Sequence, residues 1–160
     1  MLIGVISDTH GQPLPDPARR AFDGVDLILH AGDLGNEAIL AELEGIAPVE
    51  AVAGNVDPSD LATRLGRRKV VPAGGRRIGL VHGDRGPGRT TPERALGSFP
   101  PASVDVVVFG HSHQPRIDWH GEVLLLNPGS ATQPRWQPQP SVALLRIGEE
   151  IEAEIVFLPS

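Results

Sequence analysis

Short apolar runs alternate with polar stretches along the first third of the chain. Residues 1–6, 25–29 and 48–52 are apolar and rich in β-branched side chains, as is typical of strands buried on both faces. Between them, residues 13–22 contain a loop and a short helix, and residues 36–43 carry apolar side chains at helical spacing. This strand–helix alternation predicts parallel strands joined by right-handed crossovers.

The second half of the chain has a different pattern. Residues 68–73 and 77–82 flank the dipeptide Gly74-Gly75, which is a strong hairpin signal. Residues 92–96 are expected to form a short helix, and residues 104–109 a fourth fully apolar strand. Four further segments are expected to form antiparallel strands, namely 116–119, 123–126, 141–147 and 151–158. The pattern predicts a mixed α/β protein, a two-sheet β sandwich flanked by helices.

Composition narrows the class of protein. At 160 residues the chain is long enough for one domain, residues 1–160, with its own core. A net charge of −6 argues against nucleic acid as the main partner, because phosphate binding needs a positive field. Cysteine is absent, which excludes disulfides and thiolate metal sites and fits a cytoplasmic protein. No apolar stretch reaches the ~18 residues of a membrane helix, so no membrane partner is expected.

Polar side chains of metal-binding types follow five of the predicted strands. They are Asp8, His10, Asp33, Asn55, His82, His111 and His113. Because neighbouring parallel strands end at the same edge of a sheet, these side chains can converge although they lie far apart in the sequence. Oxygen and nitrogen donors without sulfur suit Mn, Fe, Co, Ni or Zn.

The number of donors indicates two metal ions. Seven donors exceed what one site with an open position would use, and Asp33, alone on its loop, is the natural bridging carboxylate. Paired ions ~3.5–4 Å apart activate a hydroxide and hold the attacking and leaving oxygens of an in-line displacement. This is the chemistry of phosphoester hydrolysis. Mn is the expected metal, with Ni, Co, Fe and Zn as alternatives.

Each of these residues also has a simpler interpretation when it is taken alone. Asp8 and Asp33 can cap turns, and Gly54-Asn55 is a common turn dipeptide. His111 and His113 are harder to explain in this way, because imidazoles beside a buried strand are costly unless they are ligated or hydrogen-bonded. Five such features in order favour the metal site.

The motifs Asp-x-His, Gly-Asp, Gly-Asn, His-Gly and Gly-His-x-His occur in this order over residues 2–147. In this the chain resembles the calcineurin-like metallophosphoesterase superfamily, and within it the small bacterial and archaeal phosphodiesterases, which are similar to the retromer scaffold subunit of eukaryotes. The resemblance implies a four-layer αββα fold and a dinuclear centre with a metal-bridging hydroxide. It assigns Asp8, His10, Asp33 and His113 to one ion, and Asp33, Asn55, His82 and His111 to the other.

Two positions depart from the pattern of that superfamily. Many members have a histidine directly after the Asn of Gly-Asn, where it assists the leaving group, but this chain has Val56. Because general-acid assistance contributes about 10²–10⁴-fold, unactivated leaving groups are expected to react slowly here. Small relatives often have a second histidine after His-Gly, where this chain has Asp84.

Three functions are compatible with these features. The leading hypothesis is a metal-dependent phosphodiesterase that acts on a small molecule, with no catalytic side chain beyond the metal ligands. A protein-interaction scaffold would carry a vestigial site, yet none of the predicted ligands is missing. A nuclease would use the basic residues in 64–77 as a phosphate track, but aromatic residues are only 4% of the chain, and a solvated strand edge is the simpler interpretation. The substrate, the native metal and a homo-oligomeric state are left open.

Overall fold

The computed structural model describes residues 1–159 and places its strands in two five-stranded sheets. The strands are β1 (Leu2–Ile6), β2 (Leu27–His30), β3 (Val49–Ala51), β4 (Arg68–Ala73), β5 (Arg76–Val81), β6 (Val106–Val108), β7 (Arg116–His120), β8 (Val123–Asn127), β9 (Ser141–Ile147) and β10 (Ile151–Phe157). The helices are α1 (Asp16–Ala21), α2 (Ala38–Glu44), α3 (Ser59–Leu65) and α4 (Thr91–Gly97).

The first sheet has the order β10-β9-β1-β2-β3. As the alternation of strands and helices predicts, β1 pairs in parallel with β2, and β2 pairs in parallel with β3. On its other side β1 pairs antiparallel with β9, so that Ile3 lies opposite Leu145. The carboxyl ends of β1, β2 and β3 therefore meet at one edge of this sheet.

The second sheet has the order β4-β5-β6-β8-β7. The predicted hairpin is present as β4 and β5, and its turn residues Gly74 and Gly75 have φ angles of 57° and 83°, which glycine adopts without a steric penalty. The expected antiparallel pairing of β7 with β8 is confirmed, and β8 also pairs in parallel with β6, which the sequence does not predict. Strand β8 is largely buried and takes the interior position, whereas β7 is exposed along its whole length and forms the edge.

The two sheets pack face to face over an apolar core. Its fully buried members include Val5 and Leu29 from the first sheet and Leu80, Val108 and Leu126 from the second. Burial of these side chains contributes roughly 1.5–3 kcal/mol each, which makes the sandwich interior the main source of stability.

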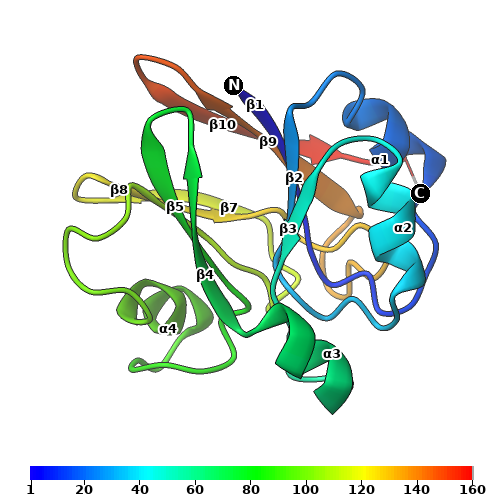
Figure 1. The fold of residues 1–160 in the computed structure, drawn as a ribbon, viewed down its shortest axis with the longest axis horizontal. Coiled ribbons are helices and arrows are strands. Elements are labelled where there is room, and N and C mark those ends of the chain that lie inside the picture. Colours follow the sequence, from blue (N-terminus) through cyan, green and yellow to red (C-terminus); the bar gives the residue numbers. More distant parts are fainter. Residues whose placement is uncertain (160) are drawn as a thin grey trace.

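Helices cover the outer faces of both sheets, which confirms the predicted arrangement. Phe22 packs with Ile28 on the outer face of the first sheet, in a cluster to which α2 adds Leu43. On the outer face of the second sheet, Ala95 of α4 packs with Val107. Figure 1 shows α1 and α2 on one side of the molecule and α4 on the opposite side. Within residues 1–159, none of the helices has the length and apolar character needed to cross a membrane.

Helix α3 was not expected from the sequence. It begins directly after Pro58 and buries one side chain, Leu61, so its apolar periodicity is weak. Strands β3 and β6 have only three residues each and are shorter than the apolar runs that contain them. The chain leaves the ladder early at both places because the residues that follow turn into the loops described next.

Candidate metal centre

Five loops at the carboxyl ends of strands bring the predicted ligands together between the two sheets. From the first sheet, Asp8 and His10 follow β1, Asp33 follows β2, and Asn55 follows β3. From the second sheet, His82 follows β5, and His111 and His113 follow β6. Each sheet therefore contributes part of the cluster, as expected for loops at the carboxyl ends of parallel strands.

Asp8 lies at the centre of this cluster and is completely buried. Its Oδ2 accepts hydrogen bonds from the Ser7 hydroxyl at 2.6 Å and from the His111 backbone amide at 3.0 Å. In the described part of the chain, its Oδ1 is the one buried side-chain oxygen or nitrogen without a hydrogen-bond partner. That atom lies 3.4 Å from Nε2 of His113 and 3.7 Å from Nε2 of His10. An unsatisfied buried carboxylate oxygen is costly, and a bound cation would remove that cost, so the residues fit a metal ion.

Asp33 lies beside Asp8. Its Oδ2 is 3.1 Å from Nε2 of His82 and 3.8 Å from Nε2 of His10, while its Oδ1 accepts a hydrogen bond from the Val56 amide at 3.0 Å. Two groups of side chains have ligand atoms within 4.8 Å of one another: Asp8 with His10 and His113, and Asp8 with Asp33 and His82. Asp8 belongs to both groups, whereas the sequence alone suggests Asp33 as the shared carboxylate.

Asn55 and His111 complete the cluster on its more accessible side. The Asn55 Oδ1 lies 3.1 Å from Nε2 of His82, and the ring of His111 packs edge-on against His82 with the centroids 5.1 Å apart. Asn55 is exposed and His111 is partly exposed, whereas His82 is buried. The structure thus brings all seven predicted residues into one cluster.

Backbone carbonyls fix the ring orientation of two histidines. Nδ1 of His82 lies 2.7 Å from the carbonyl oxygen of Ala31, and Nδ1 of His113 contacts the carbonyl oxygen of Gln133. A proton on each Nδ1 donates to that carbonyl, so Nε2 is the nitrogen that faces the carboxylates. Gly32 allows this approach, since a Cβ there would lie 2.7 Å from Nδ1 of His82.

The backbone of the cluster is strained. Asp8, His10, Asp33, His111 and His113 have φ angles between 48° and 71°, in the left-handed region that non-glycine residues seldom adopt. Such conformations cost of order 1–3 kcal/mol each and persist where the surrounding structure enforces them. None of these positions is a glycine or an asparagine, the residues that would indicate a left-handed turn from the sequence.

Burial and the charges within the cluster shift the pKa values of its members. Burial by itself raises the pKa of Asp8, but the nearby imidazoles of His10, His113 and His82 and the hydrogen bond from Ser7 together lower it to well below its usual range. Burial raises and the hydrogen bond with His82 lowers the pKa of Asp33, with a net lowering. Burial lowers the pKa of His82, but Asp33 and the charge of Asp8 raise it to about 9. The two carboxylates therefore favour a positive charge between the sheets.

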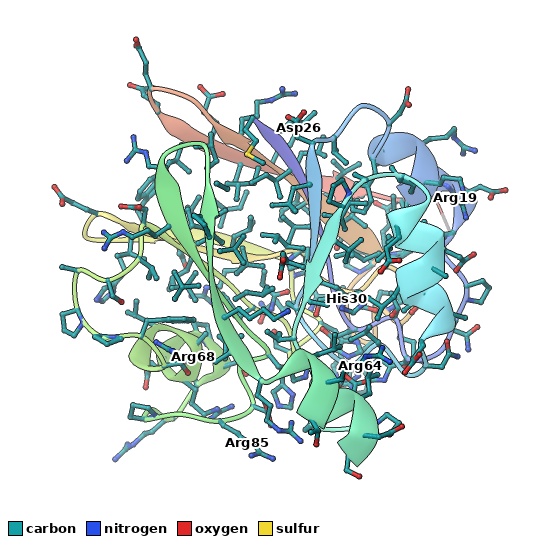
Figure 2. The ribbon with its side chains drawn as sticks, viewed as in Figure 1. Arg19, Asp26, His30, Arg64, Arg68 and Arg85 are labelled. Atoms are coloured by element: carbon teal, nitrogen blue, oxygen red, sulfur yellow. The ribbon has the colours of Figure 1, made fainter. Side chains whose placement is uncertain are left out.

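His30 is buried without belonging to the ligand cluster. Its Nδ1 accepts a hydrogen bond from the Gly32 amide at 3.1 Å, and its Nε2 lies 3.0 Å from the Thr9 hydroxyl, which donates to the Leu34 carbonyl. The ring is thereby fixed as the neutral tautomer with its proton on Nε2, and it joins the loops after β1 and β2. Figure 2 shows His30 in the interior, at the end of β2.

His30 predicts an acid-induced loss of stability. Burial lowers its pKa to about 4, against 6.5 for an unburied histidine. Between these values the unfolded chain binds a proton that the folded protein does not, so stability present above pH 6.5 is lost as the pH falls. In chelator, His30→Gln should lose about 2 kcal/mol less unfolding free energy than the natural protein between pH 7 and 5, by urea titration. Equal losses would contradict this origin.

Asn127, at the end of β8, and Ser130 hold the loops after β6 and β1 in place. The Asn127 side chain donates to the Gly110 carbonyl at 3.1 Å and accepts from the Gly129 amide at 2.9 Å. The Ser130 hydroxyl donates to the Asp8 carbonyl at 2.7 Å. Nothing in the sequence indicates that contact, because it joins segments more than a hundred residues apart.

A two-sheet sandwich with histidines and carboxylates at its strand ends defines the class of calcineurin-like phosphoesterases. A family model described as a calcineurin-like phosphoesterase superfamily domain matches residues 1–150. The chain belongs to this family, whose members use divalent metals, and the two side-chain groups above are its candidate ligands.

Comparison with individual proteins agrees with this assignment. The chain is 46% identical to a probable metallophosphoesterase of Methanothermobacter thermautotrophicus, over 98% of this chain and 92% of that protein. It is 27% identical to a phosphodiesterase of Methanocaldococcus jannaschii, over 81% and 83% of the two chains. It also superposes on Vps29 of Entamoeba histolytica complexed with Zn²⁺, with a TM-score of 0.78 and 25% identity over 98% and 99% of the chains.

Proposed function

We propose that this protein hydrolyses a small-molecule phosphodiester at a dinuclear centre, with Mn²⁺ as the first metal to test. The observation that carries the proposal is Asp8 Oδ1, a buried carboxylate oxygen without a donor that faces the imidazole nitrogens of His10 from the first sheet and of His113 from the second. The relatives named above support the phosphoester class. When bound, two such ions supply Lewis acidity and a water nucleophile at neutral pH.

The seven residues divide into two ligand sets in this proposal. Asp8, His10, Asp33 and His113 would hold one ion, and Asp33, Asn55, His82 and His111 the other. Asp33 suits the shared place, because its Oδ2 lies between His82 and His10 while its Oδ1 is occupied by the Val56 amide. His82 must give up its proton to serve as a ligand, so metal uptake should release a proton below pH 9.

The position of Val56 limits the range of leaving groups. Its side chain is 56% exposed beside Asn55 and has no proton to donate. Asp84 does not supply the missing proton donor, because its carboxylate lies 3.4 Å from Nε of Arg85 and is paired with that cation. Diesters that expel a stabilised alkoxide or phenolate should therefore react faster than substrates that need protonation of the departing oxygen.

The proposal predicts a defined response to metal. The protein is stripped with chelator, reloaded with Mn²⁺, Ni²⁺, Co²⁺ or Zn²⁺, and assayed with bis-p-nitrophenyl phosphate and p-nitrophenyl phosphate. We expect two bound ions per chain and faster hydrolysis of the diester than of the monoester. Folded, reloaded protein that hydrolyses neither ester would reject the phosphodiesterase.

The likeness to Vps29 favours a second candidate, a protein-interaction scaffold. A scaffold would not depend on its metal ligands, so a partner complex that survives their substitution would support it.

For a nuclease, the basic residues near β4 are poorly placed as a free phosphate track. Arg68 (labelled in Figure 2) lies 4.7 Å above the ring of Phe99 and donates to the Ser98 carbonyl. The Lys69 ammonium pairs with Glu50. Hydrolysis of single-stranded DNA that falls with salt would reverse this choice.

A further inference from the structure

A second buried carboxylate lies behind the ligand cluster. Asp57 is 7% exposed, and its two oxygens accept hydrogen bonds from three backbone amides. Oδ2 accepts from Gly54 at 2.8 Å and from Asp33 at 2.9 Å, and Oδ1 accepts from Gly35 at 3.0 Å. Asp57 caps no helix, because α3 follows Pro58 without a side-chain cap.

These bonds join the loop after β2 to the loop after β3. Asp33 adopts a left-handed φ of 56°, and Asp57 holds the amide of Asp33 itself and that of Gly35 two residues later. The contact between the loops is close, since a Cβ on Gly54 would overlap Oδ1 of Asp33. That same oxygen accepts from the Val56 amide. Residues 54–57 therefore surround Asp33 and leave its Oδ2 directed at His82 and His10.

We propose that Asp57 is a positioning residue that sets the metal affinity of the centre by fixing Asp33 Oδ2 and the turn that carries Asn55. It is not itself a ligand, because both of its oxygens are occupied by amides. Residues that orient ligands in this way typically contribute 10–100-fold to metal affinity or activity. This inference rests on the proposed metal centre, and it assigns to Asp57 the geometry of the shared carboxylate.

The test measures Mn²⁺ binding by calorimetric titration of the chelator-treated full-length protein. Asp57→Asn keeps the shape of the side chain but has one carbonyl oxygen, so its amide group faces at least one backbone N–H as a second donor. We expect the dissociation constant for Mn²⁺ to rise about 10–100-fold. The matched control is Asp60→Asn, an exposed acid three residues away in the first turn of α3, which should leave it unchanged.

A second measurement separates positioning from ligation. At saturating Mn²⁺, Asp57→Asn should recover turnover of bis-p-nitrophenyl phosphate to within about tenfold of the natural protein, because its ligands are intact. Asp33→Asn should not recover. If Asp57→Asn does not fold, Asp57→Ser, which leaves room for a water between the amides, takes its place in both measurements.

The possible failures are distinguishable. If the natural protein binds no Mn²⁺, Ni²⁺, Co²⁺ or Zn²⁺, the metal centre itself is rejected. If the natural protein binds metal and a folded Asp57 variant binds it with the same dissociation constant, only the positioning role is overturned. A variant with a lower melting temperature but unchanged metal affinity also overturns it, because Asp57 then serves the fold alone.

Discussion

Asp8→Asn will lower turnover of bis-p-nitrophenyl phosphate by more than about 100-fold, since changes behind the ligands already cost about 10–100-fold. The amide oxygen can keep both hydrogen bonds now made by Oδ2, from the Ser7 hydroxyl and the His111 amide. The amide nitrogen then replaces Oδ1, the oxygen that faces the imidazoles, and it cannot bind a cation. Steady-state kinetics with saturating Mn²⁺ measures the loss.

Asp8→Asn has nearly the same shape as the natural side chain, so its loss of turnover can be separated from a loss of folded structure. Because the surrounding hydrogen bonds can be kept, the far-ultraviolet circular dichroism of Asp8→Asn should match that of the natural protein. His111→Ala should also lower turnover by orders of magnitude, whereas Asp60→Asn, on the exposed face of α3, should not. Near-normal turnover in Asp8→Asn would reject the assignment of Asp8 as a ligand.

Gly35→Ala will destabilise the fold by about 3 kcal/mol or more. Gly35 has a φ of 90°, and a Cβ there would overlap the backbone nitrogen of Gly11. The left-handed conformation costs about 1–2 kcal/mol for a residue with a side chain, and overpacking adds about 1–3 kcal/mol. The obstacle is backbone, so no side chain can rotate away. The free energy of unfolding is measured by urea titration in chelator.

Gly24→Ala is the matched control for that experiment. Gly24 has a φ of 81°, close to that of Gly35, but a Cβ there would meet nothing within 4 Å. Gly24→Ala should therefore show only the conformational cost of about 1–2 kcal/mol. Equal losses in the two variants would mean that the close approach of the loops after β1 and β2 contributes nothing to stability.

The sequence predicts the strands and the candidate ligands because both follow local rules. A buried parallel strand such as β1 is a continuous apolar run, and the polar residues directly after it must lie at its carboxyl end. Convergence of Asp8 and Asp33 follows from the parallel pairing of β1 with β2, whereas His82 joins them from the second sheet through the packing of the two sheets. The order of the second sheet is not predicted by such local rules. The apolar β8 suits an interior position better than the polar β7, but its pairing with β6 depends on which strands become neighbours in the folded protein.

What the sequence could not indicate lies in contacts between distant loops. Asp57 accepts from the amides of Asp33 and Gly35, which lie more than twenty residues earlier, and it thereby supports the left-handed turn at Asp33. Helix α3 is not predicted by any apolar periodicity, for a related reason. It buries only Leu61, so tertiary packing at one side chain, not a periodic pattern, selects the helix.

The division of the candidate ligands between the two sheets has a consequence for how the protein folds. Asp8, His10, Asp33 and Asn55 precede α3, whereas His82, His111 and His113 follow the β4–β5 hairpin. A partly folded chain with only one sheet would hold either four or three of the seven candidate ligands. A metal ion that needs ligands from both sheets binds the completed sandwich and not its precursors, so it shifts the folding equilibrium toward the native state without nucleating it.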